Sequence, residues 1–153
     1  MKLPKLKSFI LILFFLNSAA WAQTTFDIGY TGRYVEKFQD GKIKYQVDIV
    51  KGKKQGKEIF YYASGNKQIQ TTYVDDLEDG IWNQWYEDGQ IKLEAYYKSG
   101  LENGSFTQWY ENGQMRVQSN FVNGKKEGSE TAWNKDGSIK YQTKYLDGKE
   151  IKQ

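Results

Sequence analysis

The chain has 153 residues, with 22 Lys and Arg, 19 Asp and Glu, and neither His nor Cys. The absence of His and Cys removes the usual members of zinc sites, catalytic triads, thiol nucleophiles and disulfides. The single proline is Pro4, so every later residue keeps its backbone donor, as a chain of paired strands requires.

The first 22 residues are typical of an export signal. Three lysines precede an apolar run at 9–16 (FILILFFL), and the small-x-small pattern Ala20-Trp21-Ala22 follows. The run is too short to cross a membrane, which takes about 20 apolar residues in a helix. No cysteine stands at the cut to accept a lipid. We therefore expect a secreted or periplasmic protein that starts at Gln23 and is not transmembrane.

Removal of this segment changes the charge balance. Three of the 22 basic residues leave with it, so 19 basic residues face 19 acidic ones. Nucleic-acid binding depends on clustered Lys and Arg against phosphate. A neutral mature chain predicts no nucleic-acid partner.

Glycines recur through the rest of the chain at intervals of 24 residues. A fixed period of this size predicts a repeat architecture. The expected units are a signal segment at 1–22, a half repeat at 23–40, repeats at 41–64, 65–88, 89–112 and 113–136, and a partial repeat at 137–153. The two unbroken glycine series are Gly41, Gly65, Gly89, Gly113 and Gly137, and Gly56, Gly80, Gly104 and Gly128.

The repeat at 89–112 shows the elements of one unit. Apolar and polar residues alternate over 91–98, which is the period of a strand, and a turn cluster follows at 99–104. A second aromatic strand at 105–110 leads into the turn at Asn112-Gly113, and such turns are a strong hairpin signal. The sequence predicts an all-β protein: an elongated antiparallel meander of 24-residue hairpins, about ten strands in a single twisted sheet.

The register of each hairpin decides which side chains share a face. A three-residue Glu-Asn-Gly loop places Trp109 opposite Met115 and Thr107 opposite Val117, which gathers the apolar residues on one side. That side is the predicted core, in which the recurring Trp residues pack between neighbouring units. Its members are Trp85, Leu93, Trp109, Met115 and Trp133, with Ile91, Val117 and Ile139.

The opposite face is the candidate binding surface. Aromatic side chains mixed with amides and charges suit recognition of proteins, glycans or extended peptides. The alternative is that a thin sheet needs rings on both sides to bury enough apolar area. The candidate residues are Trp82, Gln84, Tyr86, Tyr96, Phe106, Gln108 and Tyr110.

The repeating motif G-x-[I/M]-[K/R]-x-[E/Q]-x-x-[Y/F]-x-x-G-x-x-x-G, followed by W-Y-x-[D/N]-G, resembles the MORN-repeat variant of bacterial proteins, including the YwqK-family antitoxins. The resemblance covers 41–152. It departs at Lys67, Asp76 and Asn134, which replace an apolar residue, a glycine and an aromatic residue. It implies an elongated hairpin sheet that associates with proteins or lipid head groups.

Two chemical hypotheses concern the acidic residues. The run at 75–79 is a calcium candidate, but it lacks the ligand spacing of an EF-hand loop, and pairing of its charges with neighbouring turns is the alternative. Two carboxylates also suffice for glycoside hydrolysis, yet no predicted pocket raises the pKa of one of them. We predict no catalytic residue, no metal site and no cofactor.

These observations predict an exported, non-enzymatic repeat protein that binds an unidentified protein partner through its aromatic and polar sheet face. One alternative is an envelope-surface binder of carbohydrate or lipid head groups. Another is an immunity or antitoxin-type inhibitor of a toxin.

Overall fold

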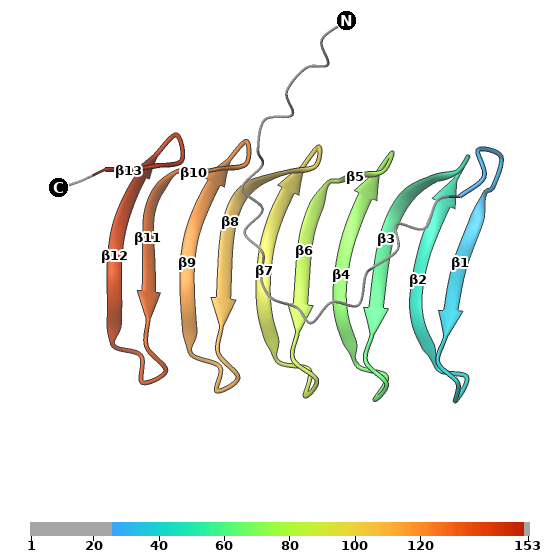
Figure 1. The fold of residues 1–153 in the computed structure, drawn as a ribbon, viewed down its shortest axis with the longest axis horizontal. Coiled ribbons are helices and arrows are strands. Elements are labelled where there is room, and N and C mark those ends of the chain that lie inside the picture. The colour runs from blue at the N-terminus through green and yellow to red at the C-terminus, as the bar shows by residue number, and fades with distance from the viewer. Residues whose placement is uncertain (1–25, 152–153) are drawn as a thin grey trace, which may run out of the picture.

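The computed structural model describes residues 26–151, so the expected export segment at 1–22 lies outside the described part of the chain. The described residues form one open antiparallel sheet whose strand order follows the chain, and the hairpins stand side by side along its long axis (Figure 1). The predicted all-β meander is confirmed. The strands are β1 (Gly32–Lys37), β2 (Ile43–Val50), β3 (Lys53–Tyr61), β4 (Lys67–Val74), β5 (Leu77–Glu78), β6 (Gly80–Trp85), β7 (Ile91–Lys98), β8 (Leu101–Trp109), β9 (Met115–Val122), β10 (Lys125–Lys126), β11 (Gly128–Trp133), β12 (Ile139–Leu146) and β13 (Lys149–Ile151).

Within residues 26–151, no helix has the length and apolar character needed to span a membrane.

One set of turns has the predicted three-residue form. In the turn between β8 and β9, the Tyr110 amide donates to the Gln114 carbonyl at 2.8 Å, and the Gly113 amide donates back to the Tyr110 carbonyl at 2.9 Å. Gly113 has a φ of 80°, which glycine adopts without strain. Trp109 consequently lies opposite Met115, as the sequence predicted.

A bulge immediately beyond this turn shifts the rest of the register. Gln108 pairs with Val117, and Thr107 pairs with Gln118 rather than with Val117, so that part of the prediction is wrong. One extra residue on the second strand exchanges the faces of all residues beyond it. The bulge recurs in every hairpin, and its extra residues are Lys44, Gln68, Lys92, Arg116 and Lys140.

A second irregularity lies near the other end of each hairpin. Between the pairs Ala95–Phe106 and Tyr97–Glu102, β7 has one residue and β8 has three. Gly104 takes up this excess with a φ of 125°, and a Cβ there would lie 3.2 Å from the Cβ of Tyr96. The same break separates β5 from β6 and β10 from β11, and for this reason the sheet has thirteen strands, more than the ten or so expected.

The turns at this end join successive units through their backbones. The Gly100 amide donates to the Glu78 carbonyl at 2.8 Å, and the Gly124 amide donates to the Glu102 carbonyl at 2.8 Å. Asp76 occupies the corresponding place with a φ of 68°, and its carboxylate accepts a hydrogen bond from the Lys54 amide at 2.7 Å. Each unit is therefore bonded to the next at a fixed interval, and the exception to the glycine series forms a side-chain bond of its own.

The best-buried part of the sheet lies at its N-terminal end. Val47 and Ile49 are 0% and 1% exposed and cluster with Tyr45. Three partly buried rings pack against this cluster, from Phe26, Tyr34 and Phe60. Phe26 belongs to the segment before β1, so this segment covers part of the sheet face.

The predicted core is buried at Leu93 but not at its other members. Leu93 is buried, but Met115 is 40% exposed and the repeated Trp side chains are only partly buried. The cause is the bulge, after which Leu93 pairs with Gln84 and Gln108 across the strands. Leu93 therefore lies on the face of these glutamines, and Trp85 and Trp109 lie on the other face.

Candidate binding face

Cross-strand pairing sorts the side chains onto two faces. Trp82 pairs with Ala95, Ala95 with Phe106, and Phe106 with Ser119, so these residues share one side. We call it the apolar face; Val47, Leu93 and Phe121 also lie on it. The opposite, polar face has a row that crosses the sheet and comprises Gln70, Asn83, Glu94, Thr107, Gln118, Thr131 and Gln142.

The predicted binding residues do not share one face. Trp82, Gln84, Phe106 and Gln108 lie on the apolar face with the buried Leu93, and both glutamines are themselves buried. Tyr96, next to Ala95 in β7, points to the polar face. The prediction that the binding residues and the core lie on opposite faces was therefore wrong for Trp82, Gln84, Phe106 and Gln108.

The two remaining candidates, Tyr86 and Tyr110, follow the ends of their strands and link neighbouring units. The Tyr86 hydroxyl donates to the Trp109 carbonyl at 2.7 Å, and the Tyr110 hydroxyl donates to the Trp133 carbonyl at 2.9 Å. Burial raises the pKa of Tyr86. The repeated Trp-Tyr pair thus serves stacking through its Tyr hydroxyl and Trp carbonyl.

Near each end of the apolar face, a lysine is held between a carboxylate and an aromatic ring. Lys54 Nζ lies 2.6 Å from Glu58 Oε1 and 4.8 Å from the centre of the Tyr73 ring. Glu58 is buried and also accepts the Tyr45 hydroxyl at 2.7 Å. Burial, and then this hydrogen bond, raise the pKa of Tyr45. The lysine charge is therefore neutralised inside its own unit.

The same arrangement recurs 72 residues later, three repeat periods on. Lys126 Nζ forms an ion pair with Glu130 and lies 4.9 Å from the centre of the Tyr145 ring. The tyrosine hydroxyl comes from a different strand here: Tyr141 lies on β12, which follows the glutamate, whereas Tyr45 lies on β2, which precedes it, and the Tyr141 hydroxyl donates to Glu130 at 3.1 Å. Burial raises the pKa of Tyr141, and the charge of Glu130 adds to this.

The two units between them differ at these very positions. Glu78 and Glu102 stand where the end units have lysine, and Trp82 and Phe106 stand where they have glutamate. The corresponding rings are Tyr97 and Phe121, and Phe106 and Phe121 lie 5.7 Å apart. We call Glu78, Trp82, Tyr97, Glu102, Phe106 and Phe121 the central acidic–aromatic site.

The two carboxylates of this site lack local compensation. Within residues 26–151, neither Glu78 nor Glu102 forms an ion pair or a side-chain hydrogen bond. Burial raises the pKa of both groups, and the charge of Glu58 raises that of Glu78 further. Lys54 and Lys126 act in the opposite direction but are already paired with glutamates. At these two repeat positions the four units together carry two lysines and four glutamates, which is a formal net charge of −2, and the two glutamates without a paired lysine are those of the middle units.

Ser119 adds a polar atom without a partner beside this site. Ser119 pairs with Phe106 across β8 and β9, so its side chain lies on the same, apolar face. The residue is 5% exposed, and its Oγ has no hydrogen-bond partner. A buried hydroxyl in that state is unusual in a native protein.

Glu78 and Glu102 were missed by the sequence reasoning. They sit in the turn region, where charges were attributed to pairing between neighbouring turns. Aligning the repeats would have revealed them, because the equivalent positions 54, 78, 102 and 126 are Lys, Glu, Glu and Lys.

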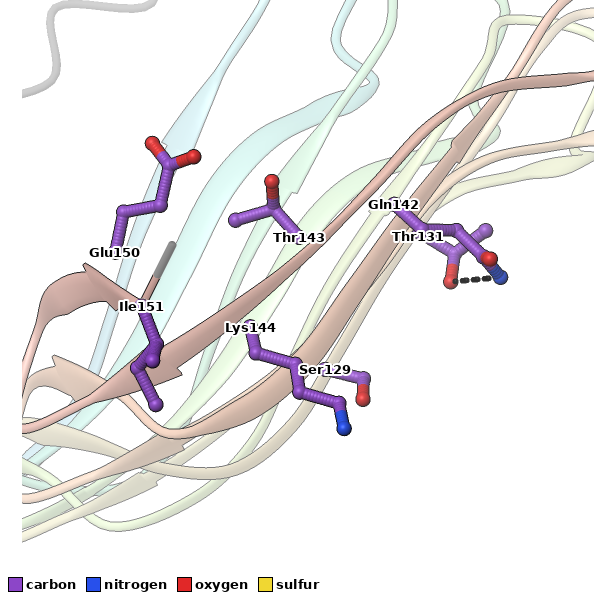
Figure 2. A pocket seen from close by; sticks show the side chains of 7 residues that line it. All are labelled: Ser129, Thr131, Gln142, Thr143, Lys144, Glu150 and Ile151. Atoms are coloured by element: carbon purple, nitrogen blue, oxygen red, sulfur yellow. Dashed lines mark hydrogen bonds between the residues drawn. The ribbon is translucent and has the colours of Figure 1, made fainter. Parts of the chain in front are cut away.

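A shallow hollow of about 290 Å³ lies at the C-terminal end of the sheet, among β11, β12 and β13 (Figure 2). Gln142 Nε2 donates to Thr131 Oγ1 across it at 3.3 Å. The side chains of Glu150 and Thr143 point away from those of Lys144 and Ser129 instead of converging (Figure 2). The hollow therefore has no arrangement of an acid, a base and a nucleophile.

The acidic run at 75–79 is engaged in contacts between units. Asp79 Oδ2 accepts the Ser99 amide at 3.1 Å, and the Asp75 amide donates to Gln55 at 3.0 Å. In the part of the chain that the structure describes, no three His, Cys, Asp or Glu side chains gather as a metal site.

Comparison with known proteins agrees with this architecture. Three consecutive stretches, residues 54–75, 78–99 and 102–123, match the family model described as MORN repeat variant. These stretches are MORN-variant repeats, as the motif predicted, and they include the whole central acidic–aromatic site. Repeats of this kind are generally associated with binding to proteins or membrane lipids and typically occur in proteins without catalytic activity. No curated protein matches the sequence.

Proposed function

We propose that this protein is a non-enzymatic interaction module that binds a protein partner through the central acidic–aromatic site. The observation that carries the proposal is the contrast between the end units and the middle units of the repeat array. The end units neutralise their own buried charges, while the two middle units present carboxylates and rings without compensation. Aromatic side chains in partly buried positions are the usual anchors of protein interfaces.

The repeat itself supplies a substitution that tests the proposal. In the fourfold variant Glu78→Lys/Trp82→Glu/Glu102→Lys/Phe106→Glu, the middle units receive the Lys–Glu pairs of the end units. We expect this variant to fold, because the same pairs already stand at these repeat positions, and to lose the partner. The measurement is affinity capture from an envelope extract with mass spectrometry, beside circular dichroism of the parent and the variant.

A matched control changes two acids outside the site. Glu87→Gln/Glu111→Gln alters exposed turn residues that are also 24 apart, so captured partners should be unchanged. Capture of the same partners by the parent and the folded fourfold variant would contradict the proposal.

A second candidate function is binding of anionic lipid head groups, and a different observation favours it. Four of the five bulge residues are basic, namely Lys44, Lys92, Arg116 and Lys140, and successive bulges are two strands apart, about 10 Å. If this row binds lipid, Lys92→Gln/Arg116→Gln should abolish sedimentation with anionic vesicles while leaving protein capture intact. Equal sedimentation of parent and variant would rule out the row.

Export is proposed from the sequence alone, on the basis of the lysines, the apolar run and the Ala20-Trp21-Ala22 pattern. An N-terminal sequence that begins at Gln23 in the secreted or periplasmic fraction is the expected result. Inhibition of a toxin remains an alternative form of protein binding, and a toxin among the captured partners would support it.

A further inference from the structure

The end units of the apolar face show how this fold holds an ammonium group. In each of them a lysine Nζ lies on a tyrosine ring, 4.8 Å from the centre of Tyr73 or 4.9 Å from that of Tyr145. The same nitrogen contacts a buried carboxylate, Glu58 or Glu130. Attraction to a ring face together with a charge-assisted hydrogen bond is a strong way to bind a cation.

The middle units contain the ring and the carboxylate but no ammonium. Tyr97 corresponds to Tyr73 and Tyr145, and no described Lys or Arg lies over its ring. Glu78 and Glu102 are both close enough to Tyr97 that, after burial, their charges raise its pKa. Tyr97 pairs with Glu102 across β7 and β8, so its ring lies beside a carboxylate, whereas in each end unit a lysine Nζ lies over the corresponding ring.

We propose that the central acidic–aromatic site binds lysine side chains of a partner protein, whose ammonium groups supply the cation that Lys54 and Lys126 supply in the end units. This inference rests on the proposed interaction function and specifies the chemistry of its partner. Glu78 and Glu102 supply the carboxylates, Tyr97 and Trp82 supply ring faces, and the unpaired Ser119 Oγ supplies an acceptor next to Phe106.

The spacing of the two carboxylates defines the partner further. Glu78 and Glu102 occupy equivalent positions two strands apart, which is about 10 Å. A polyproline II segment advances about 3.1 Å per residue and presents every third side chain on one side, so lysines three apart are separated by about 9 Å. Such a segment, laid across the strands, reaches both glutamates, and aromatic surfaces commonly receive this conformation.

The experiment uses a fluorescein-labelled peptide with lysine at every third position and proline and glycine between. Its control is the same peptide with Nε-acetyl-lysine, which has nearly the same length and no charge. We expect the mature protein to bind the lysine peptide, with a shift in Trp emission, and to bind the acetylated peptide at least about tenfold more weakly. Glu78→Gln/Glu102→Gln should weaken binding of the lysine peptide by at least about tenfold, whereas Glu87→Gln/Glu111→Gln should change it less than about twofold.

The pKa shifts of Glu78 and Glu102 predict the direction in which the Glu78→Gln/Glu102→Gln variant should change in thermal stability. The pKa of both groups is raised in the folded chain, so their ionised forms oppose folding, and this effect is present above the folded pKa and lost below the unfolded one. The glutamine variant should therefore have a melting temperature at pH 7 that is no lower than that of the parent. The difference between the two melting temperatures should shrink toward pH 4.

Each outcome has a defined meaning. Equal affinity for the lysine and acetyl-lysine peptides, or an equal loss in both double variants, would overturn the lysine inference. If no lysine peptide binds but the fourfold variant still loses its captured partner, the inference fails while the interaction function stands. If the fourfold variant keeps its partner, the interaction function itself fails.

Discussion

Lys54→Met is expected to lower the free energy of unfolding by about 3–5 kcal/mol, because it leaves Glu58 as a buried charge without its cation. The Lys54 side chain is 21% exposed and that of Glu58 only 6%. The double change Lys54→Met/Glu58→Gln should recover most of this loss, since glutamine is neutral and still offers an acceptor to the Tyr45 hydroxyl. Urea unfolding of the parent and both variants measures the effect.

An exposed ion pair near the C-terminal end of the sheet provides the control for this prediction. Lys125 and Asp147 lie 2.6 Å apart, but their side chains are 56% and 70% exposed. Water screens such a pair, and Lys125→Met should cost at most about 1 kcal/mol. Similar losses for Lys54→Met and Lys125→Met would contradict the buried character of the end-unit pair.

Ile49→Ala is expected to cost about 2–5 kcal/mol, because it removes a fully buried side chain from the cluster with Tyr45 and Val47. That is a large share of a total stability on the order of 5–15 kcal/mol. The comparison is Ile81→Ala, in which the parent residue is 41% exposed, and we expect it to cost about 1 kcal/mol or less. Thermal melts distinguish the two, and a larger loss for Ile81→Ala would show that the N-terminal cluster is not the main core.

The hairpin repeat could be predicted from the sequence because it depends on local signals. The glycine period, the alternating strands and turns such as Asn112-Gly113 each act within a few residues, and the pairing of Trp109 with Met115 follows from loop length alone. The assignment of faces failed at the next step. Arg116, the extra residue of the bulge, has no local sequence signature, yet it exchanges the faces of every residue beyond it.

The central site was only half visible in the sequence. Trp82 and Phe106 were selected for their aromatic character, and the structure confirms that they share a face. Glu78 and Glu102 were overlooked because their importance depends on what is absent around them. Only the three-dimensional arrangement shows that the lysines at positions 54 and 126 are already paired.

The backbone bonds that join each unit to the next have a consequence for partial unfolding. Since every unit is bonded mainly to its immediate neighbours, order can be lost stepwise from either end of the sheet, as in other linear repeat proteins. The central acidic–aromatic site lies on β5 to β9, with three or more strands on each side of it. Fraying from the C-terminal end, which lacks the buried cluster of Val47 and Ile49, would therefore open the last hairpins before it reached the proposed binding site.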